Sequence, residues 1–299
     1  MNTTIIITAI ELGFIFALMS SGILITFRIM NFPDLSVDGS FTLGCAVGCV
    51  FATLGHPILG IGLAFMAGCL SGLFTGLLHT VLKVQYILAG IITMTALYSV
   101  NLRVAGDVPN FSLFGKETIF SLFEKYTNDV FQNYSDIILL IFLLIIIFSM
   151  IILFFKSPIG LALRATGDNE NMVRASSIDT NKMKCLGLAL SNGLVSMAAA
   201  IYGQYQLFFD IQLGIGMMVV GLTGIIIGET IFGKKSILNY LVALTLGSII
   251  YRMLLTAALD FGMKASDWKL LSALLVTFVI SLPVIKNHIQ GWKRRNVRN

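Results

Sequence analysis

The chain has 299 residues, of which 57% are hydrophobic and 12% charged, with a formal net charge of +5. Its mean hydropathy is +0.90. A chain this apolar cannot cover its surface with polar residues, so a soluble globular protein is excluded and a polytopic membrane protein is predicted.

Nine apolar stretches are candidate membrane-spanning helices. They cover residues 5–25, 38–54, 57–81, 86–100, 136–155, 183–203, 214–232, 237–259 and 270–285. Several approach the roughly 17 to 25 apolar residues that cross a bilayer as a helix. They do not show the apolar-polar alternation of an outer-membrane barrel strand. We therefore expect one all-α transmembrane domain over residues 1–299, with about 8–10 spans and some broken or re-entrant segments.

Two charged residues lie inside predicted spans. The first stretch contains Glu11 and has no basic residues before its apolar run, so we interpret it as a retained span and not as a secretion signal. Arg252 lies within the stretch 237–259. A charge at membrane depth normally has a partner or a function, so Glu11 and Arg252 either pair with each other or line a solute pathway.

Two other stretches are interrupted by acidic residues and glycines. NFPDLSVDGSFTLGCAVG at 31–48 carries Asp34 and Asp38, and a related pattern, FDIQLGIGMMVVGLTGIIIG, recurs at 209–228. Irregular backbone at membrane depth is tolerated where it is buried or lines a cavity, and paired broken segments mark the binding site in transporters. We predict that residues 31–48 lie near a translocation path. The alternative is a cytoplasmic interface or a capped helix start.

Polar residues of the fourth and sixth predicted spans extend this candidate path. The full set is Asp34, Ser36, Asp38, Thr93, Met94, Asn192 and Gln204. Together they would line a route wide enough for an amino-acid-sized solute. For the residues of the fourth and sixth spans, Thr93, Met94, Asn192 and Gln204, hydrogen bonds that only pack helices are at least as good an explanation.

Residues 101–134 form the longest predicted loop on the outer side. They mix phenylalanines with charged residues: Phe111, Phe114, Phe120, Phe123, Glu117, Glu124 and Lys125. This mixture predicts a short amphipathic helix. It either packs against the bundle or docks an external partner.

Residues 156–184, KSPIGLALRATGDNENMVRASSIDTNKMK, form a polar loop between two apolar stretches. Loops of this length are usually functional or disordered. The segment 168–177 has few helix breakers, and Asp168 is placed as an N-cap, so we expect a short surface helix there. Met172 and Val173 would form its apolar contact, with Glu170 and Arg174 at the rim.

Enzymatic chemistry is not indicated. GETIFGKK at 228–235 approaches a phosphate-binding loop, but Lys235 occupies the position that needs a hydroxyl group, and the segment follows a span instead of a strand. His56, His79 and His288 are scattered. We expect no catalytic residue, metal or cofactor, and ATP hydrolysis would require another polypeptide.

Basic residues predict the orientation of the chain. Lys and Arg are concentrated in one set of alternate loops, which includes residues 156–184, and in the C-terminal tail. Because positive loops stay in the cytoplasm, the C-terminus and residues 156–184 are expected inside and the N-terminus outside. The basic tail is interpreted as a topology anchor that meets anionic membrane lipid and does not bind nucleic acid.

Two blocks carry a resemblance to a known family. They are NFPDLSVDGSFTLG at 31–44 and LRATGDNENMVRASSIDTNKMKCLGLALSN at 163–192, and their order and spacing agree over nearly all of the chain. By these blocks the chain resembles the membrane-spanning permease subunit of bacterial ABC importers of the branched-chain amino acid/ribose permease superfamily, with most likeness to tryptophan/tyrosine-type systems. It departs from that pattern at Ser177, where relatives tend to have glycine.

The resemblance implies a set of partners and roles. A cytoplasmic ATPase dimer would engage a coupling helix within residues 164–179, an extracytoplasmic substrate-binding lipoprotein would deliver the solute, and two permease copies would form a homodimer in the bacterial plasma membrane. The implied coupling residues are Arg164, Gly167, Asp168, Asn169, Glu170, Met172 and Arg174. The expected solute is an amino acid, and an aromatic one would fit. The alternatives are a sugar or nucleoside permease, or an ion-coupled secondary transporter that uses Asp34, Asp38 or Glu11.

Overall fold

The computed structural model describes residues 3–125, 134–233, 236–260, 270–278 and 281. Its helices are α1 (Thr3–Leu24), the π-helical turn η1 (Ile25–Ile29), α2 (Val37–Thr53), α3 (Pro57–Thr80), α4 (Tyr86–Val104), α5 (Ile119–Glu124), α6 (Ser135–Lys156), α7 (Pro158–Asp168), α8 (Glu170–Ala175), α9 (Thr180–Gln206), α10 (Met217–Phe232) and α11 (Ile237–Asp260). The first eight predicted spans match helices with ends that agree to about one helical turn. The all-α bundle is confirmed.

Six helices in the described part of the chain are long and apolar enough to cross a membrane: α1 with its π-helical end, α3, α4, α6, α9 and α11. The apolar helices α2 and α10 are shorter. These two contain the segments that the sequence marks as broken. Of the ninth predicted span, residues 270–278 are helical, and most of its remainder lies outside the described residues.

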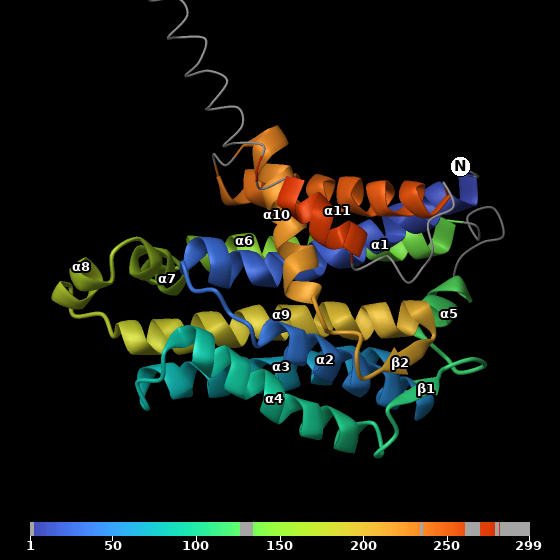
Figure 1. The fold of residues 1–299 in the computed structure, drawn as a ribbon, viewed down its shortest axis with the longest axis horizontal. Coiled ribbons are helices and arrows are strands. Elements are labelled where there is room, and N and C mark those ends of the chain that lie inside the picture. Colours follow the sequence, from blue (N-terminus) through green and yellow to red (C-terminus); the bar gives the residue numbers. More distant parts are fainter. Residues whose placement is uncertain (1–2, 126–133, 234–235, 261–269, 279–280, 282–299) are drawn as a thin grey trace, which may run out of the picture.

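The centre of the bundle is α9, with α1 on one side and α2 and α3 on the other (Figure 1). Helices approach closely because glycines face the contact. A Cβ added to Gly44 of α2 or Gly72 of α3 would lie 2.0 or 2.1 Å from backbone oxygens of α9. Such small-residue contacts let backbones pack in a bilayer, where apolar burial between helices gives no driving force.

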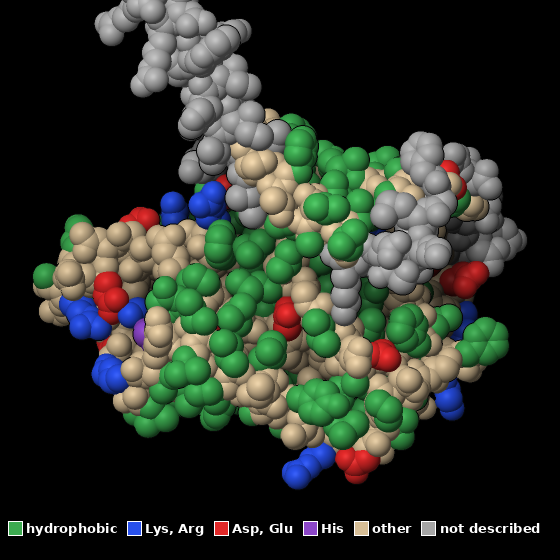
Figure 2. Space-filling model, viewed as in Figure 1, with side chains coloured by type: hydrophobic (Ala, Val, Ile, Leu, Met, Phe, Trp, Pro, Cys, Tyr) green, Lys and Arg blue, Asp and Glu red, His purple; other side chains and the backbone are tan. Residues whose placement is uncertain are grey.

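The outer helices present apolar side chains to their surroundings. Leu70 of α3 and Met150 and Leu153 of α6 are each about two-thirds exposed, and hydrophobic side chains cover much of the face in Figure 2. An aqueous solvent would penalise such a surface, whereas lipid tails match it. The surface therefore agrees with the composition in predicting a membrane environment.

One end of the bundle carries α7 and α8 and is called the α8 end below; the opposite end carries α5 and a strand pair (Figure 1). Strand β1 (Asn110–Ser112) pairs antiparallel with β2 (Phe208–Asp210), with Phe111 opposite Phe209. The sequence did not predict these strands. The amphipathic helix expected within residues 101–134 is present as α5, and its Phe120 is buried against Tyr205 of α9, with ring centroids 5.4 Å apart.

Candidate functional site

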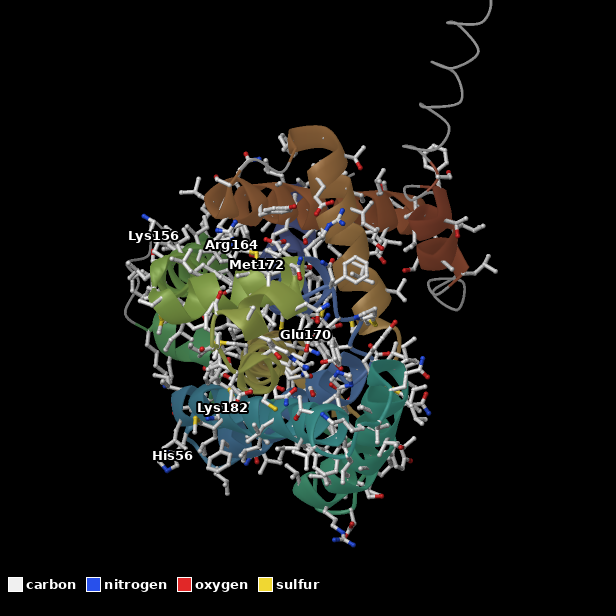
Figure 3. The ribbon with its side chains drawn as sticks, turned by 90° about the vertical axis from the view of Figure 1, so that its left-hand side faces the viewer. His56, Lys156, Arg164, Glu170, Met172 and Lys182 are labelled. Atoms are coloured by element: carbon white, nitrogen blue, oxygen red, sulfur yellow. The ribbon has the colours of Figure 1, made fainter. Side chains whose placement is uncertain are left out.

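The α8 end faces the viewer in Figure 3 and is built from the two short helices α7 and α8. Each helix begins at an N-cap whose side chain accepts a backbone hydrogen bond. The hydroxyl of Ser157 accepts a hydrogen bond from the Gly160 amide at the start of α7, and Asn169 Oδ1 accepts one from the Met172 amide at the start of α8. The expected short helix is therefore present, but its N-cap is Asn169. The prediction of Asp168 as N-cap is wrong, because Asp168 is the last residue of α7.

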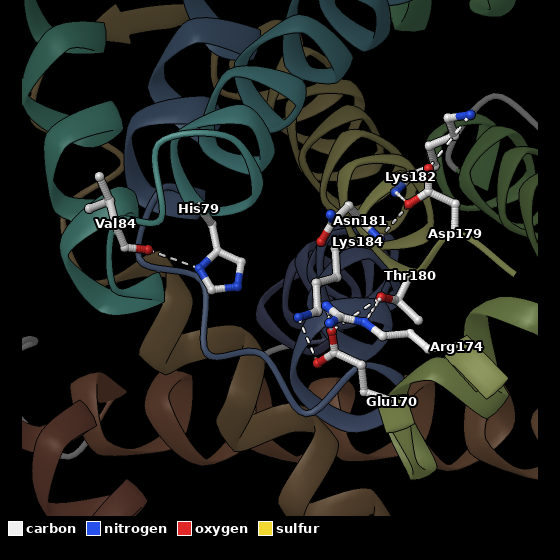
Figure 4. Close-up of polar contacts among 9 residues, drawn as sticks. All are labelled: His79, Val84, Glu170, Arg174, Asp179, Thr180, Asn181, Lys182 and Lys184. Carbon is white, nitrogen blue, oxygen red and sulfur yellow. Dashed lines mark hydrogen bonds and ion pairs between the residues drawn. The ribbon is translucent and has the colours of Figure 1, made fainter. Parts of the chain in front are cut away.

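Glu170 connects α8 to the central helix α9 (Figure 4). Its carboxylate accepts hydrogen bonds from Arg174 at 2.6 Å, Lys184 Nζ at 2.8 Å and the Thr180 hydroxyl at 3.2 Å. Partial burial opposes the charged form, but the hydrogen bonds and charges of Lys184 and Arg174 prevail and hold the pKa of Glu170 below its usual value. Glu170 therefore fastens α8 to the bundle and is not simply presented to a partner.

Met172 and Val173 differ sharply in exposure. Met172 is 69% exposed, whereas Val173 is 4% exposed. The predicted apolar contact of both residues with a partner is therefore wrong for Val173, which packs inward. Adjacent positions on a helix project about 100° apart, so one of them can face the bundle while its neighbour is exposed. Met172 is the exposed large apolar side chain of α8.

The remaining predicted coupling residues belong to α7. The Gly167 carbonyl accepts a hydrogen bond from Asn31 Nδ2 at 3.1 Å, which ties α7 to the segment that precedes α2. Arg164 and Asp168 line a small cavity of about 180 Å³ together with Arg28. These α7 residues therefore join the α8 end to the π-helical end of α1 and do not lie on α8 itself.

Ser177 has φ 61°. This left-handed conformation favours glycine, because a Cβ atom there crowds the backbone. Ser177, where the chain departs from the family pattern, therefore adopts a backbone conformation that costs conformational free energy. The turn leads into α9, whose N-cap Asp179 accepts hydrogen bonds from the amides of Asn181 and Lys182.

The two broken segments of the sequence contact each other. Asp38, in the first turn of α2, accepts hydrogen bonds from the backbone amides of Gly216 at 2.9 Å and Met218 at 2.8 Å, so it caps α10 from another helix. Gly216 has φ 88°, and a Cβ at Gly214 would lie 2.0 Å from the Asp38 carbonyl oxygen. Glycine is needed at both positions, which accounts for the Gly-rich pattern at 209–228.

Asp34 lies in the irregular segment before α2 and is 1% exposed. One carboxylate oxygen accepts from the amide and hydroxyl of Ser36, at 2.9 and 2.6 Å, and the other accepts from Asn192 Nδ2 of α9 at 2.7 Å. Asp34, Ser36 and Asn192 thus form one hydrogen-bonded cluster. The bonds also hold the broken segment against the central helix.

The other predicted path residues are dispersed. The Thr93 hydroxyl of α4 lies 2.8 Å from that of Thr75 in α3, and Met94 packs beside Gly39 of α2. At the strand-bearing end, Gln204 donates a hydrogen bond to the Pro57 carbonyl at 3.0 Å and accepts one from the Ile119 amide at 2.9 Å. Thr93 and Gln204 join neighbouring elements, as the packing alternative expects.

The charged residues inside the spans have other contacts. Glu11 accepts a hydrogen bond from the Tyr205 hydroxyl at 2.6 Å. Arg252 of α11 lies with its guanidinium carbon 5.2 Å from the Phe16 ring centroid and lines a cavity with Tyr202 and Tyr251. The sequence marked Arg252 by its charge, but it gave no signal for the aromatic residues around it, because they resemble ordinary apolar residues of a span.

The helices long enough to cross a membrane, together with the shorter inner helix α10, define a polytopic integral membrane protein. This architecture is typical of transport proteins. The chain belongs to the family of branched-chain amino acid transport system permease components, whose model matches residues 5–281. It is thus an ABC transporter permease, and such permeases are not themselves enzymes. The family implies a separate ATPase partner and usually a substrate-binding protein.

Several curated proteins are similar over most of the chain. A tyrosine transport system permease protein of Clostridioides difficile is 35% identical over 91% of this chain and 88% of the relative. An uncharacterized protein of Rickettsia prowazekii is 31% identical over 94% and 98%, respectively. An autoinducer 2 import system permease protein of Yersinia enterocolitica is 26% identical over 75% and 59%.

Proposed function

We propose that this chain is the permease subunit of a bacterial ABC importer for amino acids, driven by a separate cytoplasmic ATPase dimer. The observation that carries the coupling part is α8: a short helix that exposes Met172 and is tied by Glu170 to the central helix α9. A helix held in this way can transmit a displacement from a soluble partner to the core of the bundle. An exposed methionine suits a hydrophobic groove in that partner.

The α8 end is proposed to face the cytoplasm. The distribution of Lys and Arg supports this orientation, with the C-terminus inside and the N-terminus outside. In this arrangement the strand-bearing end, with α5 and the 87% exposed Phe114, faces an extracytoplasmic substrate-binding lipoprotein. We further propose a permease homodimer in the plasma membrane, in contact with membrane lipid.

The coupling residues divide into contact and support. Met172 is proposed as the contact with the ATPase, with Asn169 shaping the start of α8. Glu170 and Arg174 hold α8 on α9, and Gly167 ties α7 to the segment before α2. Arg164 and Asp168 border the cavity beside α7. There their charges can contribute to the charge pattern that the ATPase recognises.

The translocation path is proposed to follow the junction of α2 and α10, where Asp38 caps α10. Movement of α8 would reach this junction through α9, whose Asn192 bonds Asp34 just before α2. The cluster of Asp34, Ser36 and Asn192 would keep the broken segment in register during this movement. Met94 lies beside Gly39 in the first turn of α2 and is kept as a path residue, whereas Thr93 and Gln204 are assigned to packing.

An amino acid is proposed as the solute because the 35% identical relative is named a tyrosine transport permease. A sugar or nucleoside remains the alternative on the same scaffold, since another relative is named for autoinducer 2 import. An ion-coupled transporter is less favoured. Both carboxylate oxygens of Asp34 and of Asp38 already accept hydrogen bonds from the protein, so a bound ion would share these oxygens with protein donors.

The test is Met172→Asp with Met172→Leu as its matched control. The chain is co-expressed with its candidate ATPase and substrate-binding protein, and ATP-dependent tyrosine uptake into vesicles is measured together with ATPase co-purification. We expect Met172→Asp to lose at least about tenfold of uptake and of ATPase recovery, because a charge is placed in an apolar contact. Met172→Leu should retain both. Equal uptake by the two variants would refute the coupling assignment.

A further inference from the structure

A cavity of about 380 Å³ lies among α1, α9, α10 and α11, and residues 272 and 273 of the last described helix also border it. Small-molecule sites usually occupy roughly 300–1,000 Å³ and combine apolar walls with a few polar groups. Figure 1 shows α10 crossing the bundle beside α1 and α11. Residues of α10 line the cavity, which therefore lies along this helix. The cavity also reaches Gly216, whose amide is bonded to Asp38.

Arg252 places a cation on the wall of this cavity. Its side chain belongs to the membrane-spanning part of α11 and is 7% exposed. The guanidinium lies over the ring of Phe16, 5.2 Å from its centroid, which is a cation–π geometry. A buried charge in a span is costly, and such residues usually serve a substrate or ion pathway.

Aromatic rings form the surroundings of Arg252. Phe16 stacks on Tyr202 with ring centroids 5.8 Å apart, and Tyr251 lines the same cavity. The Tyr251 hydroxyl is 2.6 Å from Ser272 Oγ, and Gln206 Nε2 donates to the Tyr202 hydroxyl at 3.3 Å. The hydroxyl groups are thus engaged within the protein, so the rings contribute mainly apolar area to the walls.

We infer that this cavity binds the solute during passage, with Arg252 holding the carboxylate of an aromatic or branched apolar amino acid and the rings of Phe16 and Tyr202 packing on its side chain. A guanidinium has five donors in a planar fork, so it can bind a carboxylate with two parallel hydrogen bonds while it keeps other contacts. The inference deepens the proposed amino-acid import and rests on it. It adds a specificity determinant within the permease itself.

A purely structural role for Arg252 makes different predictions. If the guanidinium only stacks on Phe16 to stabilise α1 against α11, its loss would lower stability without changing ligand preference. If it binds a carboxylate, the unmodified protein must distinguish ligands by that group. Ligand analogues therefore test the inference even where an Arg252 variant folds poorly.

The experiment measures binding of radiolabelled L-tyrosine to the full chain in lipid nanodiscs, without the binding protein. Two competitors are used: tyramine, which lacks the carboxylate, and 3-(4-hydroxyphenyl)propionate, which lacks the amine. We expect the propionate to compete and tyramine to compete at least about tenfold less well, the effect of losing one charge-assisted interaction. Arg252→Gln should weaken tyrosine binding by about tenfold or more, and Arg252→Lys, which keeps the charge without the fork, by less.

Equal competition by tyramine and the propionate, or unchanged tyrosine binding by Arg252→Gln, would overturn the inference. So would absence of tyrosine binding to the wild-type chain when the assembled transporter takes up tyrosine, and in that case the proposed import stands. Uptake of ribose but of no amino acid by the assembled transporter would overturn both. The uptake assay thus separates failure of the cavity assignment from failure of the proposed function.

Discussion

Acidic residues hold two parts of this molecule together, and they do so in different ways. Near the junction of α2 and α10, Asp34 and Asp38 accept hydrogen bonds from uncharged amides and hydroxyls. At the α8 end, Glu170 is surrounded by the cations Arg174 and Lys184. The Asp34 side chain is almost fully buried, whereas a third of the Glu170 side chain is exposed.

This difference in burial predicts that the two sets of bonds contribute unequally to the stability of the protein. A buried carboxylate that loses its bonds leaves several donors unsatisfied in a medium without water, which is expensive. An exposed ion pair contributes little, because water and salt replace it readily. The hydrogen bonds of the inner junction are therefore expected to contribute more to the free energy of unfolding than the ion pairs of Glu170 do.

Replacing Asp34 should break the inner junction with the largest effect. Asp34→Ala leaves Ser36 and the Asn192 amide without their acceptor, and we expect a loss of about 2–4 kcal/mol in free energy of unfolding. Unfolding by SDS in mixed micelles measures this loss. Glu117→Ala is the control, because Glu117 forms an exposed pair with Lys125; a comparable loss there would contradict the contrast between buried and exposed acids.

Replacing Asp38 should lower stability less than replacing Asp34, but it should also reduce solute uptake. Asp38→Ala removes the cap of α10, which should cost about 1–2 kcal/mol and reduce solute uptake because the inner helix loses its fixed start. Asp38→Asn retains one acceptor oxygen but places its NH2 group at the other amide, so it should keep part of both. The same SDS titration and an uptake assay measure the two variants, and Asp38→Ala behaving like wild type would show that the cap does not position α10.

Most of the helical architecture could be predicted from the sequence, because apolar run length alone sets a membrane span. The first eight predicted spans correspond to α1–α4, α6 and α9–α11. The strands β1 and β2 escaped prediction, since three residues carry too little pattern and their pairing joins residues about a hundred positions apart. Pairing of that kind depends on where α4 and α9 end in space.

The candidate sites were predictable in part. Asp34, Asp38 and the polar loop were visible because only 12% of the residues of this apolar chain are charged. The division of labour on α8 was not, since the sequence cannot show that Val173 faces inward while Met172 faces outward. The cap from Asp38 to α10 links residues 178 positions apart, and its donors are backbone amides that no side-chain pattern reveals.

Glu170 offers the subtlest test of the contrast. Glu170→Gln removes the charge that Lys184 and Arg174 surround, and we expect at most about 1 kcal/mol less protection of α8. Because the folded pKa lies below the usual value of 4.5, the charged form stabilises α8 fully above that pH, and the contribution is lost as the pH falls through the lowered pKa. Hydrogen exchange of α8, corrected for intrinsic rates, should separate the two proteins at neutral pH and converge in acid. A difference that persists at low pH would mean that geometry, and not charge, holds α8 on α9.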